Sequence, residues 1–293
     1  QGVSTGIGAD PLYLGLVGTN TIGDEQSIPF FAPDRESFIE YDLAKLVSTL
    51  ATPERIKIGL LSGTEVAGGL DPRTGQPSSP WMVVEQAQSL FNVEVVDQNA
   101  GSFDADMSLL WIIHPAELSE ATLYNIDQYL LAGGKALIFV DPLAEAAPGP
   151  PMGQGMPPQP GSSTLGSLFE TWGVEFATDQ VMLDPLFALP VSSGPNGQPV
   201  RHPGIIGASS EAIDPTDVIT ADLETVNLSM VGYFSVSEDS SLTLQPLISS
   251  SAQAESVDSF MLQFTQDPQA LFEQFKGQGS TKVIAARLSG SIK

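Results

Sequence analysis

Three residues with chemically useful side chains, Ser62, His114 and Asp141, each directly follow an apolar run of strand length. If these runs are neighbouring parallel strands, their carboxyl ends lie at one edge of a sheet, where open parallel sheets bind ligands. A hydroxyl, an imidazole and a carboxylate would then face a common crevice. A serine hydrolase uses the same three groups as nucleophile, base and orienting acid.

The local sequence around these residues favours structural roles over catalysis. Ser62 lies in Gly59-Leu-Leu-Ser-Gly63, which is not the Gly-x-Ser-x-Gly turn that exposes a catalytic serine. Each of the three residues precedes Gly or Pro, where a polar side chain ordinarily caps a turn. Two interpretations therefore stay open, turn caps or a crevice that binds a sugar or peptide fragment. A hydrolase is the third and least favoured interpretation.

The histidines and the remaining acidic motifs do not predict a metal or nucleotide site. His114 and His202, the two histidines, lack the paired spacing of metal ligands. Asp104 and Asp106 alternate as in a calcium loop, but the full set of alternating oxygen donors is missing. Gly133-Gly-Lys135 lacks the spacing of a phosphate-binding loop. The sequence therefore predicts no metal, no cofactor and no ATP hydrolysis.

Composition excludes two further classes of function. The chain of 293 residues has 11 Lys and Arg against 35 Asp and Glu, and its net charge of −24 repels nucleic acid and anionic lipid surfaces. It contains no cysteine, which excludes disulfides, thiolate metal sites and cysteine nucleophiles. Solubility accounts for such a charge, and the sequence leaves open whether the acidic surface has a cationic partner.

The elements that position the three side chains alternate between strands and helices. This order predicts an α/β domain at residues 50–183, with an open, mainly parallel sheet and helices on both faces. Ser79 is expected to cap the first helix, with Pro80 at its first position. Trp81, Trp111 and Trp172 are expected in the core. The expected strands are 56–61, 93–96, 109–113, 136–140 and one or two within 174–183, and the expected helices are 80–91, 119–132 and 164–172.

Two other regions flank this domain. Residues 1–49 are expected to form a strand at 12–17, an extended arm and a helix. Residues 184–293 are expected to form a β-rich lobe with a helix at 266–275, and a final strand at 282–288 that returns to the main sheet.

One long loop and the absence of long apolar runs complete this prediction. The segment 144–161 holds six prolines and four glycines, which predicts a loop without regular structure. The longest apolar run, 109–113, has the length of a strand and is too short to cross a bilayer. Because the sequence begins at Gln1 without Met, we expect it to be a segment of a longer protein.

The segment Ile28–Leu43 has a strong local pattern that contains no catalytic grouping. Its two prolines hold the chain extended, and Asp34 is expected to cap the helix that follows. The apolar face expected on this helix consists of Ile39, Leu43, Leu46 and Leu50. This pattern indicates a helix that docks onto a partner, or one that packs on the chain's own core. The expected partner surface is Asp34, Arg35, Glu36, Glu40, Tyr41 and Asp42.

A series of short, ordered motifs covers nearly the whole chain and carries a family resemblance. The motifs are Tyr13–Asn20, Ile28–Phe31, Asp34–Glu36, Glu40–Leu43, Trp81, His114–Pro115, Leu123–Tyr124, Ile126–Gln128, Gly133–Lys135 and Phe139–Pro142. In this combination the chain resembles the GldG-like auxiliary component of ABC transporters, some of whose members are associated with gliding motility.

The resemblance implies a location, partners and a fold. It implies a periplasmic or extracytoplasmic domain, anchored by membrane helices outside this sequence, beside a separate permease and ATPase. The fold it implies is similar to flavodoxin-like sheets and to class I glutamine amidotransferases. Those enzymes use a cysteine, which this chain lacks, so the resemblance does not extend to amidotransferase activity. The expected function is therefore non-enzymatic, and a periplasmic glycan- or peptide-binding module is the alternative.

Overall fold

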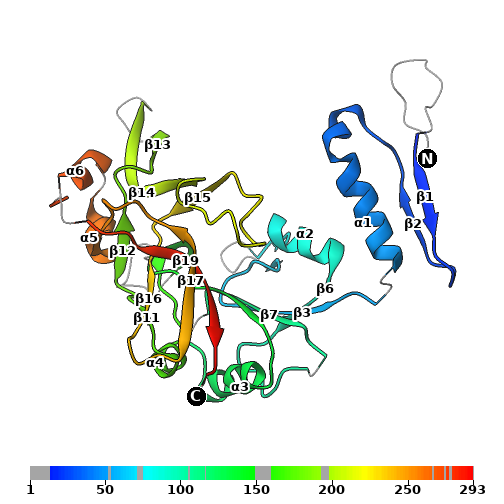
Figure 1. Cartoon of the computed structure of the whole chain (residues 1–293), viewed down its shortest axis with the longest axis horizontal. Helices are drawn as coiled ribbons and strands as arrows, with labels where there is room; N and C mark the ends of the chain where they lie inside the picture. The colour runs from blue at the N-terminus through cyan, green and yellow to red at the C-terminus, as the bar shows by residue number, and fades with distance from the viewer. Residues whose placement is uncertain are drawn as a thin grey trace. The chain divides into compact units, whose positions relative to one another are not determined.

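The computed structural model shows a mixed α/β chain whose contacts divide it into two compact units (Figure 1). The predicted α/β class is thereby confirmed. One unit comprises the described parts of 1–59, 66–95 and 106–109, and the other those of 60–65, 96–105 and 110–293. The residues that the structure describes are 14–51, 54–70, 75–104, 106–115, 117–148, 160–192, 198–265, 267–273, 275–276 and 279–292.

A four-stranded parallel sheet contains the strands expected before Ser62, His114 and Asp141. Its order is β6-β3-β7-β8, which is 2-1-3-4 when these strands are counted along the chain. Apolar side chains that are wholly buried, among them Leu60, Leu110 and Ile112, explain why the strands read as continuous apolar runs. The strands are β3 (Lys57–Ser62), β6 (Asn92–Val96), β7 (Leu109–Ile113) and β8 (Ala136–Phe139), each within one residue of its prediction.

The two helices that follow β3 and β7 differ in how well their starts were predicted. Helix α3 (Glu120–Leu131) begins as expected, because the Ser119 hydroxyl accepts the Thr122 N–H, and it ends before Gly133 at a φ of +94°. Helix α2 (Met82–Leu90) begins later than expected. Its N-cap is Trp81, so the prediction for Ser79 and Pro80 was wrong. The Trp81 N–H donates to Val66 O and thereby holds the preceding residues in an extended chain.

Two of the three tryptophans belong to the core. Trp111 and Trp172 are buried as predicted, whereas Trp81 is 46% exposed and does not belong to the core. Within the described ranges, no helix is both long enough and apolar enough to cross a bilayer.

The N-terminal elements form a hairpin with a helix packed on it. Strands β1 (Leu16–Thr19) and β2 (Glu25–Ile28) pair antiparallel, and helix α1 (Ile39–Ala51) lies against them. Leu46 is buried there, and a Cβ on Gly18 would come within 2.6 Å of its Cδ2 atom, so the close approach needs glycine. The apolar face of α1 therefore packs partly within its own unit. The strand expected at 12–17 begins only at Leu16, and residues 12 and 13 lie outside the described residues.

Asp34 does not cap this helix. A 3₁₀ helix (Pro33–Phe38) precedes α1, with Ala32 at the N-cap and no side-chain cap. The prediction was wrong because Pro33, whose fixed φ suits a first helical position, starts the helical turn before Asp34 can cap it. Asp34 instead contributes negative charge to the first turn, which suits the helix dipole.

The region after Asp141 is rich in antiparallel strands, which the sequence predicted only from residue 184 onward; β11 and β12, before that residue, also pair antiparallel. One buried apolar cluster there includes Met182, Ile206, Ala208, Ile248 and Ala254. The strands form three groups, β11-β16-β19-β17, β13-β14-β15 and β12-β18. Their bounds are β11 (Val174–Phe176), β12 (Gln180–Leu183), β13 (Ala188–Ser192), β14 (Pro199–Ser209), β15 (Thr225–Ser229), β16 (Phe234–Val236), β17 (Leu242–Ser249), β18 (Glu255–Asp258) and β19 (Val283–Gly290).

Two predictions for this region are corrected by the structure. Strand β19 does not return to the parallel sheet but pairs with β16 and β17, because an apolar run predicts a strand and not its partner. The segment 144–161 is not wholly irregular, since β9 (Ala144–Pro148) pairs with β10 (Pro160–Gly161). The register pairs Ala144 with Gly161 and Pro148 with Pro160, so proline and glycine at these positions do not prevent pairing, and residues 149–159 lie outside the described residues.

The helices of this region were only partly predicted. The helix expected within 164–172 is confirmed as α4, and the one expected at 266–275 is shorter, with residues 266 and 274 outside the described ranges. A further helix, α5, was not predicted because its six residues are too few to show a helical period. The bounds are α4 (Ser167–Trp172), α5 (Ser259–Phe264) and α6 (Pro268–Phe272), and a two-strand pair is formed by β4 (Gly69–Leu70) and β5 (Pro77–Ser78).

Candidate functional site

The ends of β3, β7 and β8 bring the backbone around Ser62, His114 and Asp141 together. The Gly63 N–H, directly after Ser62, donates to the carbonyl oxygens of Ile113 and His114, each at 3.1 Å. The His114 N–H donates to Phe139 O at 2.8 Å. The three residues therefore follow adjacent strands at the carboxyl edge of the sheet, and we call this region the strand-end crevice.

The polar side chains of Ser62 and Asp141 are engaged in turns. The Ser62 hydroxyl donates to Thr64 O at 2.9 Å and accepts the Thr64 N–H at 3.0 Å. One carboxylate oxygen of Asp141 accepts the Leu143 N–H at 2.9 Å. Among the described residues, no hydrogen bond joins any two of Ser62, His114 and Asp141. Both residues thus cap turns, and Ser62 has no base hydrogen-bonded to it.

His114 has an unusual backbone and an unusual side chain. Its φ of +42° is in the left-handed region, which costs a residue with a Cβ of order 1 kcal/mol or more. Its Nδ1 atom is buried and has no hydrogen-bond partner in the described part of the chain. Burial also lowers the pKa of His114 below its ordinary value of 6.5, so the imidazole is neutral at pH 7. Strain and an unpartnered polar atom at one residue mark it as a candidate for function.

Asp141 is the acidic group among the three residues of the crevice. Burial raises its pKa to about 6, the Leu143 N–H opposes that rise, and the negative charge of Glu145 adds to it. The backbone of Asp141 is fixed by Ser163, whose hydroxyl accepts the Asp141 N–H at 3.0 Å and whose own N–H donates to Asp141 O at 2.8 Å. The backbone of Asp141 is therefore fixed on both sides, and its carboxyl group has a pKa of about 6.

Three residues that were not predicted brace the crevice. Gln98, just after β6, donates its side-chain N–H to Ser62 O at 3.0 Å. Thr122, fully buried at the start of α3, donates its hydroxyl to Gln98 O at 2.7 Å. Asn125 donates to Ala100 O at 2.9 Å. These bonds fix the start of α3 to the ends of β3 and β6. The capping pattern of Ser119 predicted where α3 starts. Nothing in the sequence indicated that Thr122 at this start would bind Gln98, which is 24 residues away.

Asp184 follows β12 as Asp141 follows β8, but it is fully buried. One of its carboxylate oxygens accepts the N–H groups of Leu186 and Phe187 and the Ser251 hydroxyl, and the other accepts the Ser251 N–H. Four donors satisfy this carboxylate, so it has a structural role.

The acidic and histidine motifs considered for metal binding are far from forming a ligand set. Asp106 lies 3.3 Å from Lys57 Nζ, and His202 Nδ1 accepts the Gly204 N–H at 3.1 Å. Within the described ranges, no three His, Asp or Glu side chains come close enough to hold a metal ion.

The predicted partner surface lies along η1 and α1. Arg35 binds Asp42 at 2.9 and 3.1 Å and stacks 5.4 Å above the Phe38 ring, so these charges are already paired. Glu36 and Glu40 remain exposed beside a shallow groove of about 820 Å³. Its lining is Glu36, Ser37, Ile39, Glu40, Leu43, Ala44, Val47 and Ser48, and we call it the α1 groove.

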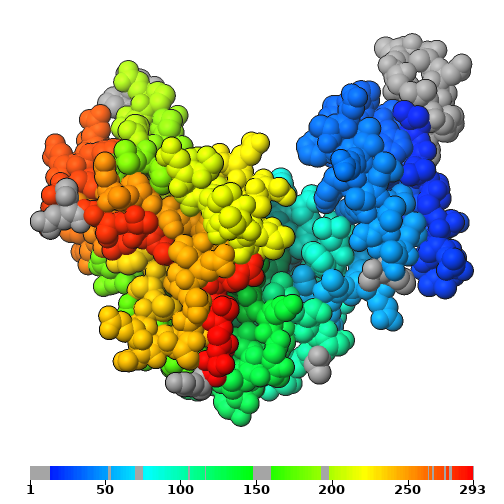
Figure 2. Space-filling model, in the orientation of Figure 1, coloured from blue at the N-terminus to red at the C-terminus, as the bar shows by residue number. Residues whose placement is uncertain are grey.

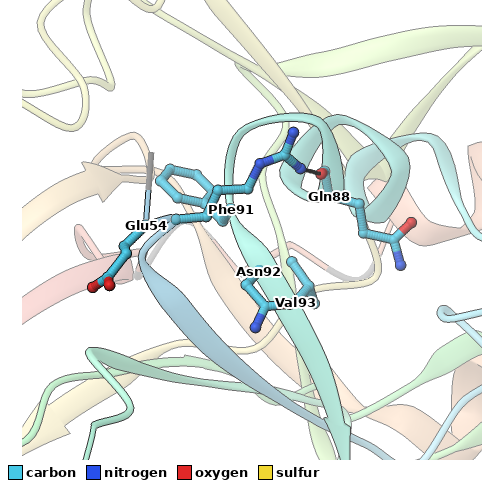
Figure 3. A pocket seen from close by; sticks show the side chains of 6 residues that line it. Glu54, Gln88, Phe91, Asn92 and Val93 are labelled. Atoms are coloured by element: carbon cyan, nitrogen blue, oxygen red, sulfur yellow. Dashed lines mark hydrogen bonds between the residues drawn. The ribbon is translucent and has the colours of Figure 1, made fainter. Parts of the chain in front are cut away.

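A second depression, of about 490 Å³, lies at the amino ends of β3 and β6 (Figure 3). Arg55 is one of its lining residues and donates to Gln88 O at 3.0 Å, which caps the last turn of α2. Open parallel sheets bind ligands at the carboxyl ends of their strands, whereas this depression lies at the amino ends. We therefore assign Arg55 a structural role as a helix cap and not a role in ligand binding. The residues that line it are Glu54, Arg55, Gln88, Phe91, Asn92 and Val93.

The comparison with known families decides the identity of the larger part of the chain. A family model described as an ABC-type uncharacterized transport system matches residues 55–293. The chain belongs to this family. It is an auxiliary component of an ABC-type transport system, which confirms the predicted resemblance at that level. No curated protein and no solved structure matches the chain.

The matched range also separates two parts of the chain. The parallel sheet, the strand-end crevice and the β-rich region lie within it, whereas the hairpin and α1 precede it. Many of the motifs that resemble GldG-like proteins lie in 13–43, before the match begins. The narrower family name therefore stays a prediction.

Proposed function

We propose that this chain is a non-enzymatic, extracytoplasmic domain of a membrane-anchored auxiliary protein, which works beside a separate permease and ATPase. Membership of the transport family is the observation that carries this proposal. The turn that engages the Ser62 hydroxyl supports the non-enzymatic part. A gliding-motility system is the narrower form of the proposal, and it rests on the ordered motifs between Tyr13 and Pro142.

The α1 groove is the surface that we propose for contact with the permease. On its lining, Leu43 is 36% and Val47 62% exposed, although Leu46 of the same helix is buried against the hairpin. The helix thus has a second apolar strip beside the one it buries, with exposed Glu36 and Glu40 along its edge. Such a strip is a candidate for protein contact.

Co-purification of the full-length protein with its permease and ATPase tests this proposal. Val47→Asp places a charge in the groove and is expected to abolish the association. Ile22→Asp is the matched control, because Ile22 is 74% exposed in the turn of the same hairpin and is not part of the groove. Equal retention of the permease by both variants would remove α1 from the interface. Wild-type transport in a deletion strain, with no association, would overturn the whole proposal.

Ligand binding in the strand-end crevice is a second candidate function. The strand order 2-1-3-4 is the beginning of a flavodoxin-like order, whose switch point falls between β3 and β7, where Ser62 and His114 lie. A neutral imidazole and a carboxyl with a pKa of about 6 suit hydroxyl and amide groups better than an anion. The ligand class that we propose is therefore a glycan or a peptide fragment.

Thermal unfolding of the chain with a panel of envelope glycans and peptides tests this second function. A ligand at a hundred times its Kd adds about 2.7 kcal/mol to the free energy of unfolding. His114→Ala is expected to remove the added stability, and Ile22→Asp to preserve it. A flat response across the panel would exclude a crevice ligand of these classes. Glycan or peptide turnover that Ser62→Ala abolishes would replace both proposals with a hydrolase.

A further inference from the structure

The loop of residues 214–224, between β14 and β15, buries the polar side chains of Asp217 and Thr220 and exposes three aliphatic side chains. Val218 is 87% exposed, Ile219 56% and Leu223 43%. Single exposed aliphatic residues are common on protein surfaces, but three within one short ordered loop form a patch. The loop belongs to the yellow surface in Figure 2.

The loop is fixed at its centre by a carboxylate. Asp217 is buried and accepts the Arg287 guanidinium at two points, 2.7 and 2.9 Å. The same carboxylate accepts the Ile219 N–H at 2.9 Å. Since Arg287 lies on β19, the exposed tip is attached to a strand of the β-rich region by a bidentate ion pair.

A second set of bonds fixes the start of the loop. The Asp214 N–H donates to Leu247 O on β17 at 2.9 Å, and the Gln245 side chain donates to the Asp214 carboxylate at 3.3 Å. Thr220 is buried and donates its hydroxyl to Asp214 O at 2.7 Å. The conformation that presents Val218 and the other aliphatic side chains is therefore formed before any partner arrives, which lowers the entropic cost of binding.

The charge around the loop selects the partner. From residue 202 to residue 275 the sequence has eleven acidic residues and no Lys or Arg. Asp222 and Glu224 are exposed on either side of Leu223 in the chain, and Arg287 is already bound to Asp217. A second copy of this acidic chain and an anionic lipid surface would both be repelled. A protein segment with Lys or Arg next to apolar side chains would be attracted.

We propose that the 214–224 loop is a preformed docking site for a cationic segment of a protein partner, whose apolar side chains cover Val218, Ile219 and Leu223. The site lies within the family-matched range and does not depend on the α1 groove or on the strand-end crevice.

The test uses three synthetic peptides of equal length, added to the full chain and followed by fluorescence anisotropy. They are a lysine–leucine peptide, a lysine–serine peptide and a glutamate–leucine peptide. Only the first has both features of the proposed partner, so it is expected to bind most tightly. Val218→Ser with Ile219→Ser should weaken its binding about tenfold, by loss of buried apolar area. Asp222→Asn with Glu224→Gln should weaken it about fivefold and reduce its salt dependence.

Two matched controls separate the loop from general acidity. Leu186→Ser removes an aliphatic side chain that is 55% exposed elsewhere, and Glu238→Gln with Asp239→Asn removes two other exposed charges. Both are expected to keep the affinity within about twofold. Equal binding of the two lysine peptides, or equal weakening by loop and control variants, would overturn the proposal. So would loop-dependent binding to zwitterionic vesicles, or loop-dependent self-association in sedimentation, each without peptide binding.

Discussion

Asp141 and Asp184 occupy the same position in two parts of the molecule, and the structure treats them differently. Each follows a strand and precedes a proline. Asp184 is fully buried and receives four hydrogen bonds, three of which come from backbone N–H groups. Asp141 is half-buried, receives the Leu143 N–H, and has a pKa raised to about 6. One carboxylate is stabilised by four donors, and the other has a single backbone donor and a raised pKa.

The largest effect of this difference is expected for Asp184→Ala. The substitution removes the acceptor of the Leu186 and Phe187 N–H groups and of the buried Ser251 hydroxyl, which should lower the free energy of unfolding by roughly 3 kcal/mol or more. Urea denaturation measures this loss. Asp141→Ala is the matched variant and should cost much less. Equal losses at both positions would mean that the hydrogen bonds of Asp184 do not distinguish it from Asp141.

A smaller change in the free energy of unfolding is expected from the titration of Asp141. Its folded pKa of about 6 exceeds the ordinary 3.8, so between these values the folded state keeps a proton that the unfolded state loses. The free energy of unfolding therefore falls as the pH rises through this window, and it stays lower above it. Asp141→Asn removes this dependence and should raise the free energy of unfolding by about 2 kcal/mol at neutral pH.

Denaturation curves of the wild type and of Asp141→Asn between pH 4 and pH 8 check this prediction. Asp141→Asn and the wild type should be nearly equal in stability at the acid end and diverge towards neutral pH. Parallel curves over the whole range would show that the crevice does not perturb this carboxyl group.

The sequence predicted the strands better than it predicted such differences. Continuous apolar runs gave the four parallel strands, and the pattern from Ser119 to Gly133 gave α3, because both signals are local. The distinction between the two aspartates depends on Ser251, which is 67 residues from Asp184. The pairing of β19 with β16 and β17 also depends on tertiary contacts. The positive φ and the unpartnered Nδ1 atom of His114 depend on backbone geometry and burial, which the local sequence does not show. The domain boundaries and the role of the predicted site residues stay predictions.

The smallest expected change in stability comes from the backbone strain of His114, which lies in the strand-end crevice with Asp141. Alanine ordinarily stabilises a protein relative to glycine by about 0.5–1 kcal/mol, because glycine has more freedom in the unfolded chain. At a φ of +42° a Cβ is strained, so His114→Gly should be more stable than His114→Ala by about 1 kcal/mol. Val95, exposed on β6, provides the control pair, where alanine should keep its usual advantage. Thermal unfolding of the four variants decides the sign, and an advantage for alanine at both positions would show that the crevice stores no backbone strain at His114.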